Sequence, residues 1–234
     1  MIKTEVTSRF PELQQIEIEP GTVLDGELIV TDKEGKPDFE AMMRRFQTNL
    51  VKDRQQVQYV VFDVIYRNNQ NVSRMPLVKR KELLADFLGP DTELLAQIKY
   101  VIGYGKELYD AIKQEHLEGI VQKQAQSVYE IGKRSHSWLK VIDYNFAEVM
   151  ISGYLKNKLG WLLQFDNGVY AGMMELGIPS EAKNVFYSIA SQLITREKEN
   201  VVYIEPIIQC KVKYRNMTSK GLLRLPSFVE FIIQ

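Results

Sequence analysis

The stretch from Glu118 to Asp143 (EGIVQKQAQSVYEIGKRSHSWLKVID) combines a carboxylate, lysines and aromatic side chains between two β-branched segments. A carboxylate such as that of Glu118 binds hard divalent cations through oxygen, and the amines of Lys123 and Lys140 neutralise phosphate as point charges. The stretch therefore predicts a site for a polyphosphate and its metal ion. Taken alone, the same pattern is also typical of a hairpin with a solvated charged face.

Two earlier segments each place a carboxylate among apolar residues. Residues 22–31 are expected to form one strand, in which Gly26 permits close approach of a neighbour and Glu27 points into a cleft. The Asp-Gly pair before Glu27 is equally typical of a turn or bulge. Residues 57–66 (VQYVVFDVIY) form the strongest predicted strand, and a buried Asp63 within it needs a partner.

These candidate residues need a scaffold, and the first part of the chain predicts a mixed one. Helices are expected at 77–88 and 104–115, and Asp38 is expected to cap another whose Phe39, Met42, Met43 and Phe46 face the core. Further strands are expected at 3–10 and 98–102. Strands and helices thus interleave, which indicates the α+β class. Both 22–31 and 57–66 are apolar on two faces and are expected to have strand neighbours on each side.

The character of the chain changes near residue 145. A strand over 146–156 is followed by a predicted hairpin of 161–165 and 169–174, a helix and two strands at 201–205 and 207–214. This order is expected of an OB-fold, the five-stranded Greek-key barrel. The predicted domains are therefore 1–145 and 146–234. The helix is expected to begin behind Pro179 with Ser180 as its cap and to bury Val185, Phe186, Ile189, Leu193 and Ile194.

The second domain carries a cluster of cations that the overall charge conceals. The 234 residues hold 30 basic and 30 acidic side chains. Nevertheless, no acid lies between Pro206 and Val229, where the basic side chains predict contact with nucleic acid, the alternative being a solvated barrel face. They are Lys211, Lys213, Arg215, Lys220 and Arg224.

Composition sets the cellular context. The single Cys210 cannot form an internal disulfide, and the first five residues lack the apolar core of a signal peptide. The longest apolar runs are too short to cross a bilayer. We therefore expect a cytoplasmic protein with no membrane role.

Read together, the signals form an ordered set of motifs: Ser8-Arg9, Asp25-Gly26-Glu27, Phe62-Asp63, EGIVQK at 118–123, WLK at 138–140 and RLPSF at 224–228. This set closely resembles the ATP-dependent DNA ligases of the covalent nucleotidyltransferase superfamily, which also contains RNA ligases and mRNA capping enzymes. The spacer SVYEIGKRSHSW is similar to that of small bacterial and phage-type enzymes. The resemblance implies an adenylation (nucleotidyltransferase) domain with antiparallel sheets over 1–145, followed by an OB-fold domain.

The resemblance implies that ATP and Mg²⁺ are used to seal nicked duplex DNA. A lysyl-AMP intermediate transfers AMP to the 5′-phosphate, which the 3′-hydroxyl then attacks. By resemblance, Phe62 stacks on adenine, Glu27 accepts from ribose hydroxyls and Glu118 holds the metal. By the same resemblance, Lys140 and Lys123 neutralise the α-phosphate and Arg9 binds the phosphate at the nick. The basic cluster of the second domain adds Lys211, Lys213 and Arg224 as expected contacts to DNA phosphates. Phe62 is also compatible with a purely structural role in the core.

Three departures from the family pattern concern phosphate handling. The nucleophilic lysine of the family lies in a Lys-x-Asp-Gly motif before Ser8-Arg9, and this tetrapeptide is absent, since Lys3 is followed by Thr-Glu-Val. Ile142 stands where a second lysine is expected, and residues 229–233 replace a charged tail. We therefore expect a ligase that lacks its first segment, with an open sheet edge prone to self-association, and a monomer when complete.

Two alternatives stay open. One is a non-catalytic module that binds nicks or nucleotides, which the missing lysine favours. The other is an RNA ligase or a capping-type nucleotidyltransferase.

Overall fold

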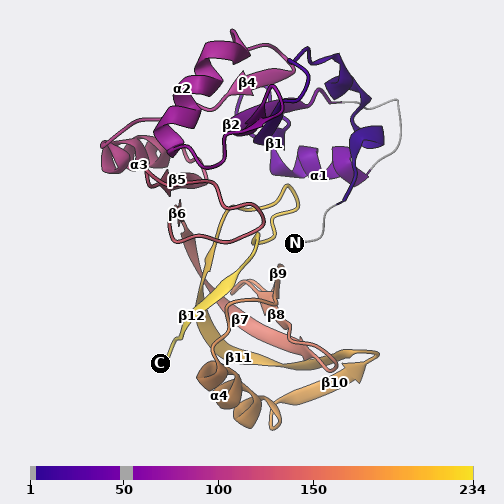
Figure 1. Ribbon diagram of the computed structural model, residues 1–234. Helices are drawn as coiled ribbons and strands as arrows, with labels where there is room; N and C mark the ends of the chain where they lie inside the picture. The colour runs from indigo at the N-terminus through magenta and orange to yellow at the C-terminus, as the bar shows by residue number, and fades with distance from the viewer. Residues whose placement is uncertain (1–3, 48–54, 234) are drawn as a thin grey trace. The chain divides into compact units, whose positions relative to one another are not determined.

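The computed structural model describes residues 4–47 and 55–233. The chain forms two compact units, the first from Met1–Leu108 and Val121–Lys140, the second from Tyr109–Ile120 and Val141–Gln234. Each unit contains its own sheet (Figure 1). The fold is thus α+β with mainly antiparallel sheets, which confirms the predicted class, while the domain boundary at residue 145 stays a prediction.

The central strand of the first unit is β2 (Gln58–Arg67), which matches the strand predicted over 57–66. It pairs antiparallel with β1 (Val23–Ile29) and β3 (Gln70–Asn71), and parallel with β4 (Leu95–Gln97). In the described part of the chain β2 has several strand neighbours, as predicted. Among the described residues, strand β1 pairs with β2 alone, so the sheet has an open edge there, which the sequence also led us to expect.

Two helices cover this sheet. Helix α2 (Leu77–Leu88) packs against β2 over the range predicted for it, and its Leu84 is fully buried with Val61 and Val64. Helix α1 (Phe39–Gln47) is capped as predicted, because the N–H of Ala41 donates to Oδ1 of Asp38 at 2.9 Å.

The predicted core face of α1 is only partly right. Met42 and Phe46 pack against the buried Ala41, but Phe39 and Met43 are exposed. The side of the helix that points inward is completed by the aliphatic part of Arg45, whose guanidinium pairs with Glu12 at 2.8 Å.

The strand predicted over 3–10 is wrong for the described residues. Within this range the structure has a 3₁₀ helix, η1 (Thr7–Arg9), and a second one, η2 (Pro11–Gln15), follows it. Pro11 cannot donate to a strand ladder and suits the first position of a helix, which explains the turn. Lys3 lies outside the described residues.

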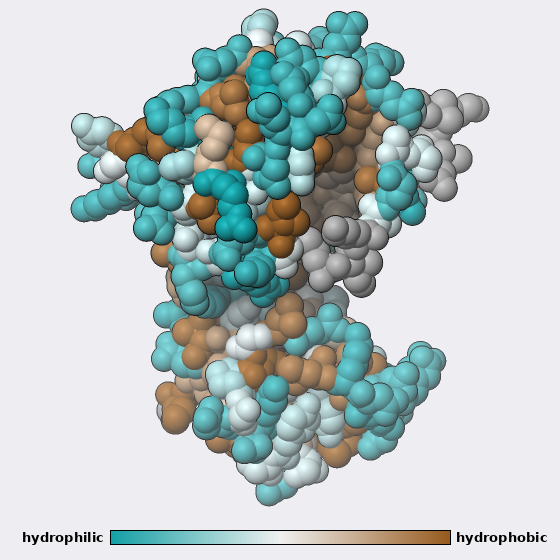
Figure 2. All heavy atoms as spheres, in the orientation of Figure 1, coloured by the Kyte–Doolittle hydropathy of each residue, from teal (hydrophilic) through white to brown (hydrophobic). Residues whose placement is uncertain are grey.

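The strand predicted at 98–102 is also misplaced, because the strand present there is β4 and ends at Gln97. The β-branched residues that suggested a strand are exposed instead, as the 61% exposed Ile102 illustrates. Figure 2 shows hydrophobic side chains at the surface among hydrophilic ones.

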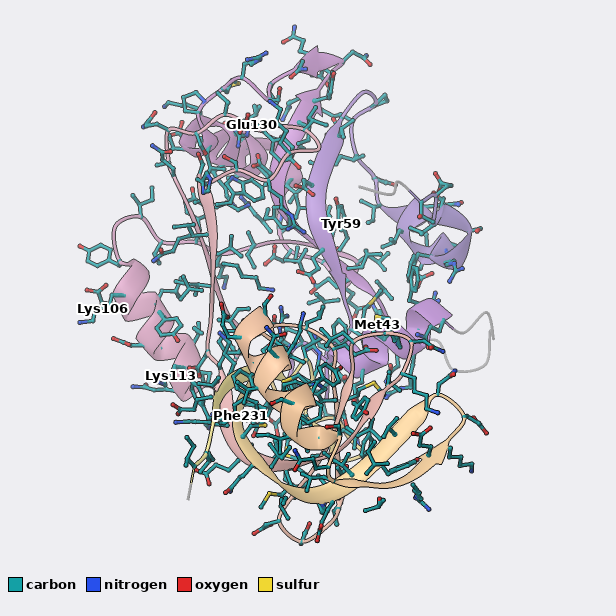
Figure 3. All side chains as sticks on the ribbon, turned by 90° about the horizontal axis from the view of Figure 1, so that it is seen from below. Met43, Tyr59, Lys106, Lys113, Glu130 and Phe231 are labelled. Atoms are coloured by element: carbon teal, nitrogen blue, oxygen red, sulfur yellow. The ribbon has the colours of Figure 1, made fainter. Side chains whose placement is uncertain are left out.

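The stretch from Glu118 to Asp143 contains a two-stranded sheet of β5 (Gly119–Lys123) and β6 (Trp138–Ile142). Gly119 has φ +147°, and a Cβ there would lie 2.1 Å from the carbonyl oxygen of Val141. Only glycine permits this approach. The preceding helix α3 (Gly105–Gln114) matches the prediction over 104–115, and Lys106 and Lys113 project from it (Figure 3).

The second unit is built on a six-stranded sheet in the order β10-β11-β7-β8-β9, with β12 also paired to β11. Its core centres on the fully buried Trp161, whose ring lies 4.3 Å from that of Phe186. The strands are β7 (Asn145–Leu155), β8 (Trp161–Gln164), β9 (Tyr170–Met174), β10 (Ile194–Lys198), β11 (Val201–Tyr214) and β12 (Ser227–Phe231).

Strand β11 replaces the two predicted strands at 201–205 and 207–214. The chain passes through Pro206 at a shift in its pairing with β7, between Tyr203 and Ile208. A proline, which cannot donate a ladder hydrogen bond, is tolerated at such a bulge. Strands β10 and β12 were not predicted.

Helix α4 (Ser180–Ala190) buries Phe186 as predicted, but the other residues of its buried face differ from the prediction. Its N-cap is Pro179, not Ser180, and no side chain caps it. The buried positions are Ala182, Phe186 and Ala190, each four residues apart. Val185, Ile189 and Ile194 are exposed, whereas Leu193 packs against the core as expected. Among the helices described, none is long and apolar enough to cross a membrane.

Candidate functional site

Asp63 on β2 is buried and paired, as the sequence required, and its partner is Arg80 on α2. The guanidinium donates from Nε to Oδ1 at 2.7 Å and from Nη2 to Oδ2 at 2.9 Å, and both side chains are fully buried. Arg80 also donates to the carbonyl oxygen of Ser127 at 3.1 Å. One residue therefore joins the central strand, a helix and the connection between β5 and β6.

Next to this ion pair, Phe62, Trp138 and Lys123 form a cluster that we call the Lys123 cage. The ring centroids of Phe62 and Trp138 are 6.1 Å apart, with the planes inclined by 80°. Nζ of Lys123 lies 4.2 Å from the first centroid and 3.4 Å from the second. The two rings thus surround the amine with their electron-rich faces.

The cage changes the acidity of Lys123. Burial lowers the pKa of the amine to about 8, because removal from water disfavours the charged form. The nearby Asp63 and Asp25 oppose this fall in the pKa, whereas Lys81 and Arg80 add to it. The pKa of Lys81 is itself lowered, mainly by burial.

Tyr129 holds the connection between β5 and β6 against β1. Its hydroxyl donates to Oδ2 of Asp25 at 2.6 Å, and its backbone N–H donates to the carbonyl oxygen of Ser73 at 2.8 Å. Burial raises the pKa of Tyr129, and the hydrogen bond to Asp25 adds to the rise. Its ring also packs edge-on against Trp138 at 5.7 Å. Sequence reasoning did not single out Tyr129, although it lies in the spacer SVYEIGKRSHSW.

Glu27 and Lys140, the other predicted nucleotide ligands of this unit, are both exposed. The close approach predicted at Gly26 is confirmed, since a Cβ there would lie 2.6 Å from the ring of Tyr59 and from the carbonyl oxygen of Val60. Figure 3 shows Tyr59 on β2. The roles of Glu27 and Lys140 stay predictions.

Arg9, the predicted ligand of the nick phosphate, is exposed, but its side chain contacts Phe46. Its Nη1 donates to the carbonyl oxygen of Phe46 at 2.6 Å, and its guanidinium carbon lies 4.6 Å from the centroid of that ring. The residue thus packs on the end of α1, and its contact with DNA stays a prediction.

Glu118, the predicted metal ligand, belongs to the second unit, where it pairs with two arginines of the barrel. It contacts Arg215 directly, and Nη1 of Arg224 lies 3.8 Å from its Oε2. The described residues contain no group of three or more potential metal ligands. A lone carboxylate still fits Mg²⁺, which is commonly bound through one or two carboxylates together with substrate phosphates.

Basic residues of the predicted patch form ion pairs with acidic residues that lie outside the segment from Pro206 to Val229. Besides the pairs with Glu118, Nζ of Lys211 lies 3.9 Å from Glu230 on β12. Nζ of Lys213 instead lies 4.9 Å from the ring centroid of Tyr144. Lys211 and Lys213 alternate along β11 and therefore share a face of the sheet. Their contact with DNA stays a prediction.

Comparison with known families assigns both parts of the chain. Residues 3–141 match the family described as "ATP dependent DNA ligase domain", and residues 167–231 match "DNA ligase OB-like domain". The first match contains every residue of the Lys123 cage.

Individual relatives agree with these matches. The chain is 45% identical to the SPbeta prophage-derived DNA ligase-like protein LigB of Bacillus subtilis, covering 96% of this chain and 80% of LigB. It is 26% identical to the multifunctional non-homologous end joining protein LigD of Mycolicibacterium smegmatis, covering 96% of this chain but 32% of LigD. A solved mycobacterial DNA ligase D complexed with ATP and MES is 25% identical, with a TM-score of 0.50 over 90% of this chain and 72% of that one.

Proposed function

We propose, since the chain belongs to the ATP-dependent DNA ligase family, that it acts on nicks in duplex DNA, where it joins a 5′-phosphate to a 3′-hydroxyl through an AMP-linked intermediate. The observation that carries the proposal is the Lys123 cage beside the buried Asp63–Arg80 pair. An aromatic face and a cation held by a rigid support suit a ligand that is part base and part phosphate.

Three residues of the first unit bind different parts of the nucleotide. Phe62 offers a ring for stacking with adenine, and the carboxylate of Glu27 accepts hydrogen bonds from ribose hydroxyls. Lys140 neutralises the α-phosphate, where negative charge must be stabilised as the phosphoryl group is transferred. Glu118, a residue of the second unit, would supply one oxygen to Mg²⁺, which as a Lewis acid would polarise the phosphate oxygens.

The second unit provides the surface for the duplex. In this proposal, Lys211 and Lys213 on one face of β11, together with Arg224, bind phosphates of the DNA backbone. Arg9, a residue of the first unit, binds the phosphate at the nick. Contacts to phosphate carry no base information, so we expect little sequence preference.

The test is the binding of ATP to the purified chain, measured by calorimetry, combined with sealing of a nick that already carries AMP. Phe62→Ala should weaken ATP binding at least about fivefold, because stacking of a base on an aromatic ring contributes about 1–3 kcal/mol. Tyr104→Ala, which removes an exposed ring of the same unit, is the matched control. Equal ATP affinities for the Phe62 and Tyr104 variants would contradict the assignment of the base site.

A second candidate is a non-catalytic module that binds nucleotides or nicks. The observation that favours it is the absence of a Lys-x-Asp-Gly tetrapeptide from the 234 residues. Such a module would bind ATP and nicked DNA but would seal neither a plain nick nor an adenylated one.

A further inference from the structure

The amine of Lys123 lies where the proposed function places a base. At 4.2 Å from the Phe62 centroid, Nζ occupies the space in front of one ring face. A stacked base would need its atoms about 3.5–4.0 Å from the same ring. The amine and a base therefore cannot occupy this face of Phe62 together.

We propose that Lys123 is a movable gate on the base-binding face of Phe62, and that nucleotide binding transfers its amine from the rings to the phosphates. This inference rests on the proposed function, because it takes Phe62 as the stacking residue. It makes Lys123 a residue that selects nucleotides over nucleosides. A nucleoside must displace the amine without offering it a new partner, whereas a nucleotide offers its phosphates.

The cage holds the amine loosely enough for this exchange. The aromatic rings attract the cation only modestly, and the lowered pKa indicates that the surroundings disfavour the charge on balance. A phosphate group would give the charged amine a negatively charged partner. The lysine stem has four carbons and rotates freely compared with the planar side chain of arginine.

The rest of the cage is fixed, so the amine is the part that can move. Trp138 is braced by the edge of Tyr129, which is itself held by Asp25 and by the carbonyl oxygen of Ser73. Phe62 lies on the central strand directly beside the buried Asp63–Arg80 pair. Displacement of Lys123 therefore leaves both rings in place to receive a base.

The test compares the affinities of adenosine and ATP for the unchanged protein and for Lys123→Met, which keeps an apolar side chain but removes the amine. We expect Lys123→Met to bind adenosine at least about threefold more tightly and ATP at least about threefold more weakly. A residue with a purely structural role would change both affinities in the same direction. Lys106→Met, at an exposed lysine of α3, is the control and should change neither.

The outcomes separate the two proposals. If ATP binds to the unchanged protein but Lys123→Met does not bind adenosine more tightly, the gate is refuted and the nucleotide site stands. If Lys123→Met strengthens adenosine binding but leaves ATP binding unchanged, the transfer to phosphate is refuted. If the unchanged protein does not bind ATP, the proposed function and the gate fail together. A second variant, Lys123→Gln, should reproduce the same opposite changes and guards against an effect of methionine itself.

Discussion

Arg80 and Asp63 form a bidentate ion pair in which neither side chain has any exposed surface. The pair fixes α2 to β2 at the residue that follows Phe62. Through the carbonyl oxygen of Ser127 it also fixes the connection that leads to Trp138. The stability of the first unit and the shape of the Lys123 cage therefore depend on the same contact.

Removal of Arg80 should leave a buried carboxylate without its partner. We expect Arg80→Met to lower the free energy of unfolding by about 3–5 kcal/mol, measured by urea denaturation, because an uncompensated buried charge is strongly unfavourable. Lys79→Met is the control, since Lys79 and Glu82 form an exposed pair at 2.8 Å that is worth less than about 1 kcal/mol. Similar losses in the two variants would show that the buried pair is not a major support of the fold.

The absence of a Lys-x-Asp-Gly tetrapeptide leads to a prediction about self-adenylation. We expect that the 234-residue chain, incubated with Mg²⁺ and ATP radioactive at the α-phosphate, will not acquire a covalent label. Sealing of a nick that already carries AMP bypasses this step and is the comparison reaction. Stable AMP mapped to any lysine of the chain would overturn the prediction.

The sequence was most informative where periodicity and burial act locally. The strand at 57–66 and the helix at 77–88 have strong apolar patterns, and both lie where they were predicted. The need of Asp63 for a partner was also evident, because a buried carboxylate is costly. The identity of that partner was not, because no local pattern selects Arg80 from the other basic residues.

The contacts that complete the sites join residues far apart in the chain. Tyr129 and Asp25 are separated by 104 positions, and Arg215 and Glu118 by 97. The segment between Pro206 and Val229 contains no acid, yet folding brings Glu118 to two of its arginines. Local patterns carry no information about such pairs, which is why the basic patch looked less neutralised in the sequence than it is in the fold.

The salt dependence of DNA binding tests the face of β11. Each neutralised phosphate releases condensed counterions, so the Lys211→Ala, Lys213→Ala double variant should reduce the slope of log affinity against log salt by up to about two units. Of the two single variants, Lys213→Ala should reduce the slope more than Lys211→Ala, because Lys211 lies beside Glu230. Lys156→Ala, at a lysine paired with Glu197, is the control. An unchanged slope in the double variant would place the DNA surface elsewhere.

The outer edge of β1 predicts self-association, because in the described part of the chain β1 pairs with β2 alone. Val23→Lys, at a residue that is 49% exposed on this strand, should shift the protein toward the monomer in sedimentation experiments. Val185→Lys adds the same charge at a 48% exposed position of α4 and should have no such effect. A protein that is monomeric without either change would contradict the prediction.

The lowered pKa of Lys123 leads to a specific dependence of stability on pH. The pKa of the amine is about 8 in the folded protein and about 10.4 in an unfolded chain. Between these values the unfolded chain holds a proton that folded Lys123 has released, so stability should rise with pH. Below pH 8 the folded protein bears the cost of a charge removed from water.

Lys123→Met removes both the cost of taking the charged amine out of water and the titration of that amine. We therefore expect this variant to be more stable than the unchanged protein at pH 7, and the difference to shrink at pH 9.5, measured as the free energy of unfolding in urea. Lys81, whose pKa is also lowered, is present in both proteins, so its own titration contributes to both. The pKa of Tyr59 is raised to about 12, which keeps its titration in the folded state above this range. A difference between the two proteins that stays constant from pH 7 to pH 9.5 would mean that the amine of Lys123 is not removed from water in the cage.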